Sequence, residues 1–193
     1  MNRAERRNQS RPKSSARKTG ITYLTVAGVI GGTIGLASPA FAATSVDCDD
    51  LASDLTSLTT TGGTLTIAFT DPDPVTCDLA EGYVFQLPTT IVGPADGSLN
   101  LRFTGALSEG YVGFAFSEGG VHSVSNLNFT KSTGASLNFL IELLPSQSLT
   151  VSNSTFSDAS MVAAIYAEGD LTVSNSTFEN LTSFNGGAAI YVG

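Results

Sequence analysis

The sequence predicts an all-β fold, a right-handed parallel β-helix (β-solenoid) with a short N-terminal capping helix. The main observation is an internal repeat of short apolar strands that recurs every 22 to 27 residues without a helical pattern inside it. A single repeat of this size cannot bury its own apolar face, so neighbouring repeats are expected to stack as coils. A leucine-rich repeat has a similar period, but its leucine consensus is missing here. Right-handed coiling is expected because crossovers between parallel strands are right-handed in nearly all cases.

Three six-residue segments carry the repeat, Val124–Phe129, Val151–Phe156 and Val173–Phe178. Their last residues are offset by 27 and 22 positions, and Phe103 lies another 26 positions earlier. A second column follows in step. We expect both columns to stack inside the solenoid at the strand spacing of about 4.8 Å. The columns are Phe129, Phe156 and Phe178, and Ile141, Ile165 and Ile190.

Asparagines recur in phase with these columns, at Asn126, Asn153 and Asn175. Asparagine tolerates the left-handed backbone of a sharp corner, and its amide can donate to the same residue one coil away. The pattern therefore favours a structural ladder at a corner. The alternative is N-glycosylation, because four Asn-x-Thr acceptor sequences occur, at Asn128, Asn153, Asn175 and Asn180.

Residues 43–63 are expected to form a cap on the first coil, and residues 64–193 the coils. Apolar residues at helical spacing predict a short helix from Asp50 to Leu58, capped by Asp47 or Asp49. The threonines at 59–61 and the glycines at 62–63 are expected to end it. Such a cap is needed because an open first coil would template pairing with another chain.

Alternating apolar residues predict strands at Thr64–Phe69 and Ser98–Phe103, and a further short strand lies within Leu87–Pro94. Between the first two, Asp71–Pro74 is expected to be a loop because proline cannot continue a strand. This loop lies between Cys48 and Cys77, the two cysteines of the chain. In an exported protein they are expected to form a disulfide worth about 3.5 kcal/mol. Metal binding is the weaker alternative, because two thiols offer too few ligands for zinc.

The first 42 residues have the pattern of a removable secretion signal. A basic arm precedes an uncharged apolar run at Ile21–Ala37, and small residues at Ser38–Ala42 suit cleavage after Ala42. A membrane anchor is the alternative, but seventeen helical residues rise only about 25 Å, less than the hydrocarbon core. The mature domain is therefore expected to be secreted or displayed on the cell surface, without inserting into a membrane.

Removal of the signal leaves a strongly acidic domain. Arg102 and Lys131 remain against sixteen acids, a net charge of −14. No basic patch could neutralise a phosphate backbone, so nucleic acid is excluded as a partner.

The segment Asn175–Asn180, followed by Gly186-Gly187-Ala188, resembles the repeats of polymorphic outer-membrane proteins and autotransporter adhesins. Those repeats pair Phe-x-x-Asn with Gly-Gly-Ala and an aliphatic residue. Here Phe178 and Asn180 are one residue closer, and an extra Ala189 precedes the aliphatic position. The resemblance implies a surface protein with an adhesive role.

Parallel β-helices also include enzymes that cleave polysaccharides, but the sequence predicts no catalytic, cofactor or metal site. Glycoside hydrolysis needs paired carboxylates, whereas the acids here are scattered over the helix start, the proline loop and several turns. His122 is the only histidine and has no serine or cysteine partner identifiable from spacing. No glycine-aspartate array for calcium is present.

The expected function is therefore non-enzymatic adhesion or surface display toward cell-surface glycans or proteins. Tyr166 and Tyr191 follow the isoleucine column and would stack on adjacent coils, where an outward pair could contact sugar rings. The alternative is the non-catalytic N-terminal part of a polysaccharide-active lyase or hydrolase. The chain stops at Val192-Gly193 directly after a repeat strand, so we expect it to be a fragment.

Overall fold

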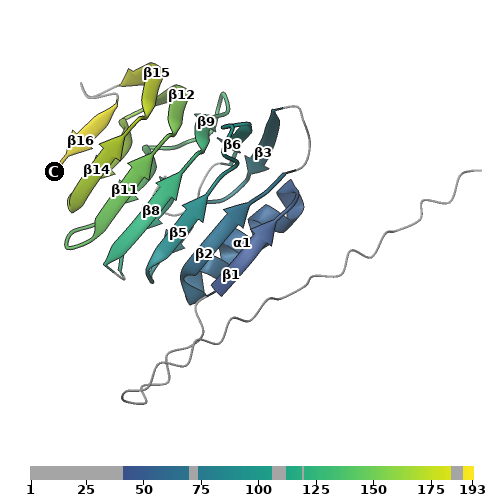
Figure 1. The fold of residues 1–193 in the computed structure, drawn as a ribbon. Coiled ribbons are helices and arrows are strands. Elements are labelled where there is room, and N and C mark those ends of the chain that lie inside the picture. Colours follow the sequence, from purple (N-terminus) through teal and green to yellow (C-terminus); the bar gives the residue numbers. More distant parts are fainter. Residues whose placement is uncertain (1–40, 70–73, 106–111, 119, 184–188) are drawn as a thin grey trace, which may run out of the picture. The chain divides into compact units, whose positions relative to one another are not determined.

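The protein is a parallel β-solenoid, as its repeat predicts (Figure 1). The computed structural model describes residues 41–69, 74–105, 112–118, 120–183 and 189–193. The predicted secretion signal up to residue 40, the loop residues 71–73 and the Gly186-Gly187-Ala188 motif lie outside the described residues. No helix among the described residues is long and apolar enough to cross a membrane.

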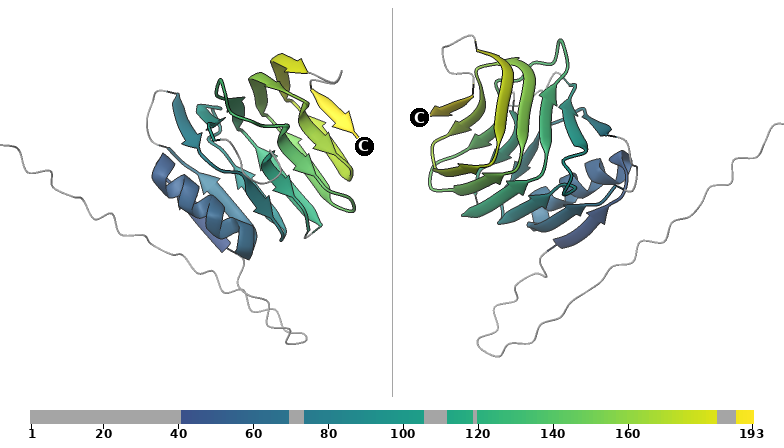
Figure 2. Two further views of the ribbon diagram at one scale, coloured as in Figure 1. Left: turned by 180° about the vertical axis from the view of Figure 1, so that it is seen from behind. Right: turned by 45° about the horizontal axis from the view of Figure 1, so that its top comes forward.

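Three parallel sheets wind through five coils, each coil passing from sheet A to sheet B to sheet C. Figure 2 shows the strands of successive coils side by side in each sheet. Sheet A contains β1 (Phe41–Ser45), β2 (Gly63–Ile67), β5 (Thr89–Val92), β8 (Val121–Ser125), β11 (Ser148–Ser152) and β14 (Asp170–Ser174). Sheet B contains β3 (Val75–Leu79), β6 (Leu99–Phe103), β9 (Asn128–Lys131), β12 (Thr155–Met161) and β15 (Thr177–Ser183). Sheet C contains β4 (Tyr83–Phe85), β7 (Val112–Phe116), β10 (Phe139–Leu143), β13 (Ala163–Ala167) and β16 (Ile190–Val192).

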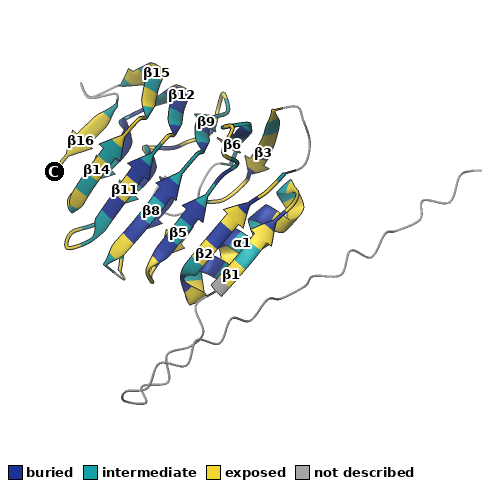
Figure 3. Cartoon of the chain, viewed as in Figure 1, coloured by how far each residue is buried: buried dark blue, intermediate teal, exposed yellow. Residues whose placement is uncertain are grey.

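The repeat columns form the interior of the solenoid. In sheet B, Phe156 pairs in register with Phe129 and Phe178, and its ring stacks on theirs at centroid distances of 5.0 and 4.9 Å. Ile165 pairs in the same way with Ile141 and Ile190 along sheet C. Ile141 and Ile165 are fully buried, whereas Ile190, in the last described strand, is 38 % exposed rather than interior as expected. Inward and outward residues alternate along most strands, which gives the banded burial pattern of Figure 3. Stacking like on like therefore builds a continuous core from coils that could not fold alone.

The phenylalanine column does not continue to Phe103 as its offset suggests. Leu101 is the register partner of Phe129, and Phe103 pairs with Lys131 instead. The difference arises at the corner before β6, where residues 93–98 separate it from β5, whereas only residues 126–127 separate β8 from β9. The ring of Phe103 remains buried and meets Phe114 edge to face at 5.7 Å.

The cap is a helix, α1 (Cys48–Thr61), that packs against the first coil. Asp47 is its N-cap, because a side-chain oxygen accepts the backbone N–H of Asp50 at 2.8 Å. Three leucines face inward, fully buried, at positions 51, 55 and 58. The helix runs past its predicted end at Leu58, since the hydroxyls of residues 59–61 donate to carbonyls of the preceding turn. Gly62 ends it with a φ of 62°.

A strand also precedes the helix, which the sequence did not predict. In β1, Ala43 pairs with Leu65 of β2, so sheet A begins one strand before the first complete coil. Ser45 ties this strand to the helix, because its hydroxyl donates to Asp54 Oδ2 at 2.7 Å. Cleavage after Ala42 falls inside β1 and would leave the pairs from Ala43 to Ser45 in place.

The predicted disulfide is confirmed. Cys48, the first residue of α1, is bonded to Cys77 in β3, with their Cα atoms 5.2 Å apart. The bond joins the cap to sheet B of the first coil and closes a loop with a sequence separation of 29.

The asparagine column occupies the corner between sheets A and B. Asn126, Asn153 and Asn175 have φ angles of 58°, 50° and 49°, the left-handed conformation expected of them. The expected bonds between like amides are not what links the coils, however. Asn126 Nδ2 donates to the carbonyl of Gly93, at 3.4 Å, rather than to a like residue.

Serine hydroxyls link the coils at this corner instead. Ser154 Oγ accepts the backbone N–H of Leu127 one coil earlier, at 3.3 Å, and Ser176 Oγ accepts that of Ser154, at 3.2 Å. Each hydroxyl also donates to a carbonyl two residues before it, Ser152 and Ser174, at 2.9 Å. The serines that follow Asn153 and Asn175 therefore satisfy backbone groups that the corner would leave unpaired.

Candidate functional site

The outer face of sheet C carries a stack of three aromatic rings. Tyr166 of β13 lies between Phe139 of β10, at 4.8 Å, and Tyr191 of β16, at 5.6 Å, measured between ring centroids. The ring planes differ by 22° and 17°, so the three rings are nearly parallel. Tyr191 is 47 % exposed. We call this set of rings the aromatic stack.

The solenoid register places these side chains. Glu142, Tyr166 and Tyr191 each follow an isoleucine of the buried column, and they are register partners on consecutive coils. Because neighbouring residues of a strand point to opposite faces, burial of Ile141 and Ile165 directs Glu142 and Tyr166 outward, and Tyr191 pairs in register with Tyr166. The sequence predicted the tyrosine pair but missed Glu142, although its place after Ile141 carries the same signal. It also missed Phe139, whose ring joins the stack from the start of β10.

Two carboxylates flank the aromatic stack. The Tyr166 hydroxyl donates to Glu168 Oε1 at 2.6 Å, and this hydrogen bond, with burial and nearby negative charge, raises the pKa of Tyr166 to about 12. Burial, together with the charge of Glu168, raises the pKa of Glu142 above its ordinary value. Glu142 and Glu168 therefore both place negative charge near Tyr166 on sheet C.

No lysine or arginine among the described residues lies in sheet C, so the described part of this sheet supplies no cation to these acids. Arg102 and Lys131 are both in sheet B strands. The Arg102 guanidinium donates to both carboxylate oxygens of Asp78, at 2.6 and 2.8 Å, and this lowers the pKa of Asp78. Lys131 Nζ donates to the Ser160 carbonyl at 2.9 Å.

His122 is buried in sheet A rather than placed in a cleft. Its side chain is 1 % exposed, its ring lies 4.8 Å from that of Phe116, and its Nε2 lies 2.9 Å from the carbonyl of Glu118. Burial is the largest influence and lowers its pKa, against the backbone carbonyl of Glu118 and the side chain of Gln147. Arg102, Lys131 and His122 are thus each engaged in separate structural contacts and do not form one site.

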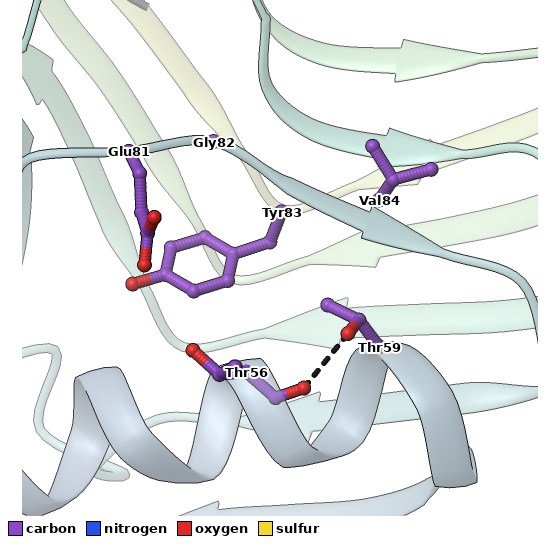
Figure 4. Close-up of a pocket in the computed structure, with 6 residues that line it drawn as sticks. All are labelled: Thr56, Thr59, Glu81, Gly82, Tyr83 and Val84. Carbon is purple, nitrogen blue, oxygen red and sulfur yellow. Dashed lines mark hydrogen bonds between the residues drawn. The ribbon is translucent and has the colours of Figure 1, made fainter.

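A shallow pocket of about 200 Å³ lies between α1 and β4 (Figure 4). The Tyr83 ring extends between Glu81 and the helix residue Thr56. Burial, with the charge of Glu81, raises the pKa of Tyr83 to about 12, so its hydroxyl is a weak acid at neutral pH. Glu81 is the one carboxylate in the described lining, and it lies beside the Tyr83 phenol.

The described residues contain no group of three or more histidine, cysteine, aspartate or glutamate side chains that could hold a metal ion. The aromatic stack is the candidate site, because it combines apolar ring surface, exposed at Tyr191, with the neighbouring carboxylate of Glu168. Comparisons with known protein families, with curated proteins and with solved structures found no match for this chain.

Proposed function

We propose that this chain is a secreted or cell-surface module for adhesion or surface display, without catalytic activity, and that its aromatic stack contacts glycans. The observation that carries the proposal is the Phe139–Tyr166–Tyr191 stack, in which Tyr191 is exposed and the other two rings are partly exposed, bordered by Glu168 and Glu142. Aromatic rings offer sugars an apolar surface, while carboxylates and phenol oxygens accept hydrogen bonds from sugar hydroxyls.

Three further observations support an extracellular role. The Cys48–Cys77 disulfide suits an oxidising compartment. The N-terminal sequence has the pattern of a secretion signal, cleaved after Ala42. The resemblance of the segment from Asn175 to Ala188 to surface-adhesin repeats points in the same direction.

A glycan array tests the proposal with the domain from Ala43 to Gly193. We expect binding that weakens on Tyr191→Ala, because this change removes the most exposed ring of the stack. Val121→Ala is the matched control, since it truncates an apolar side chain that is 70 % exposed on sheet A. Failure to bind any glycan, or equal losses in the two variants, would contradict the proposal.

An assay of polyuronate cleavage separates adhesion from enzymatic function. We expect no turnover, with or without calcium, because Arg102, Lys131 and His122 are each held in other contacts. Turnover that disappears in Arg102→Ala would contradict the adhesion proposal and indicate a catalytic function.

A further inference from the structure

We propose that the glycan bound by the aromatic stack carries protonated amines, as a polymer of amino sugars does. This inference rests on the proposed function and adds the chemical class of the ligand. It follows from the charge around the stack, from the free acceptor on Tyr166 and from the exposure of Tyr191.

The charge around the stack is negative, and no basic side chain among the described residues neutralises it. Glu142 and Glu168 interact with each other and with Tyr166. The two basic side chains of the described coils belong to sheet B, where Asp78 and the Ser160 carbonyl engage them. A carboxylate-bearing glycan would add a like charge to this face, whereas an ammonium group would relieve the repulsion that the structure already contains.

The aromatic rings complement a cation in a second way. A ring face attracts an ammonium group through its quadrupole, and a carboxylate within reach adds a charge-assisted hydrogen bond to the same group. Tyr191, at the end of the stack among the described residues, is the ring with the greatest exposure. An amino sugar can therefore lie against Tyr191 and direct its ammonium group toward the acids.

The Tyr166 hydroxyl is also available as an acceptor. Its proton is already donated to Glu168, so its oxygen lone pairs are free to accept from an ammonium group. The neighbouring residue is Gly193, where a Cβ atom would lie 2.7 Å from the Tyr166 hydroxyl oxygen. A side chain at this position would therefore crowd the hydroxyl.

Matched oligosaccharides test the inference by calorimetric titration of the domain from Ala43 to Gly193. The probes are β-1,4-linked glucosamine oligomers and their fully N-acetylated counterparts of the same length, at a pH where the free amines are protonated. A charge contact with exposed Glu168, one with partly buried Glu142 and one cation–ring contact together predict about tenfold tighter binding of the free-amine oligomer. The preference should shrink as salt is added, because these contacts lie at the protein surface, where dissolved ions screen charges.

Glu168→Gln isolates the role of charge, because glutamine can still accept the hydrogen bond from Tyr166. We expect this variant to bind the free-amine oligomer about two- to fivefold more weakly and the acetylated oligomer unchanged. Glu179→Gln is the matched control, since it removes an exposed carboxylate from β15 of sheet B. It should leave both affinities as they are.

The outcomes distinguish this inference from the proposed function. Equal affinity for the two oligomers, lost in Tyr191→Ala, would overturn the amine preference and leave glycan contact at the stack intact. Equal weakening by Glu168→Gln and Glu179→Gln would also overturn it, because a general charge effect would then explain the preference. Binding of neither oligomer would overturn the inference, and the absence of any bound glycan on the array would remove the proposed function as well.

Discussion

Replacing Phe156 with alanine removes the central ring of the buried stack in sheet B. Phe156 is fully buried and lies between Phe129 and Phe178, at 5.0 and 4.9 Å, with ring planes only 6° from parallel on either side. Truncation of a buried phenylalanine costs about 3–5 kcal/mol. Loss of the two ring stacks places the expected cost near the upper end, about 4–5 kcal/mol.

The neighbouring ring and an outward residue provide the comparison. Phe178 is only partly buried and has one of these stacked neighbours among the described residues, so Phe178→Ala should cost about half as much. Ser152→Ala, on the outer side of sheet A, should change the free energy of unfolding by about 0.5 kcal/mol or less.

Urea denaturation, followed by far-ultraviolet circular dichroism under oxidising conditions, measures these differences. The order of cost should be Phe156, then Phe178, then Ser152. Similar small costs for Phe156→Ala and Ser152→Ala would mean that the coil register is wrong, since this register buries Phe156 and places Ser152 on the outer side.

Three further predictions concern the disulfide, the corner and the buried histidine. Reduction of Cys48–Cys77 should lower the free energy of unfolding by about 3.5 kcal/mol, measured by urea denaturation with and without reductant. Asn153→Ala should cost about 1–2 kcal/mol because alanine disfavours a φ of 50°, and Asn153→Gly should cost less. The pKa of His122 lies below its ordinary 6.5, so its neutral form is favoured in the folded state. The contribution of neutral His122 to the free energy of unfolding should be complete above pH 6.5 and should decline as the pH falls below this value. The free energy of unfolding of His122→Leu should lack this pH-dependent decline.

Each of these three predictions has a result that contradicts it. Peptide mapping without reductant that finds both cysteines free in the exported protein would refute the first. A glycine variant no more stable than the alanine variant would show that backbone conformation is not what selects Asn153. Identical pH dependence of stability in wild type and His122→Leu would show that His122 is not held neutral by burial.

The buried columns could be predicted because the interior of a solenoid repeats. The core position filled by Phe129 is filled again by Phe156 and Phe178, so identity and spacing together reveal the register. The same logic failed at Phe103, because a longer corner before β6 shifts the register there by two residues. Sequence spacing measures chain length between coils, and it reports register only where the corners have equal length.

The sequence predicted the backbone conformation at the corner between sheets A and B but not the hydrogen bonds that link the coils there. A left-handed residue could be expected at Asn153 from intrinsic preference alone. The role of Ser154 could not, because its hydroxyl acts on the backbone of another coil, at Leu127. The bond from Ser154 to the nearby Ser152 carbonyl is a local one that a turn serine commonly makes. The bond with Leu127 depends on how the coils stack, which the local sequence does not specify.

The candidate site also has residues that the repeat predicts and residues that it does not. The tyrosine pair was expected because Tyr166 and Tyr191 follow residues of the isoleucine column. Phe139 joined the stack from the start of its strand, where the alternation of inward and outward residues is less regular. The position of Glu168 depends on the turn that follows β13, which repeat spacing does not specify.

Mapping of the binding surface in solution tests the central claim most directly. Backbone amide spectra of the ¹⁵N-labelled domain from Ala43 to Gly193 would be recorded while the glucosamine oligomer is added. The account predicts progressive shifts at Glu142, Tyr166, Glu168 and Tyr191, with little change across the outer faces of sheets A and B. Shifts centred instead on the pocket between α1 and β4, or on the acids of sheet B, would contradict it.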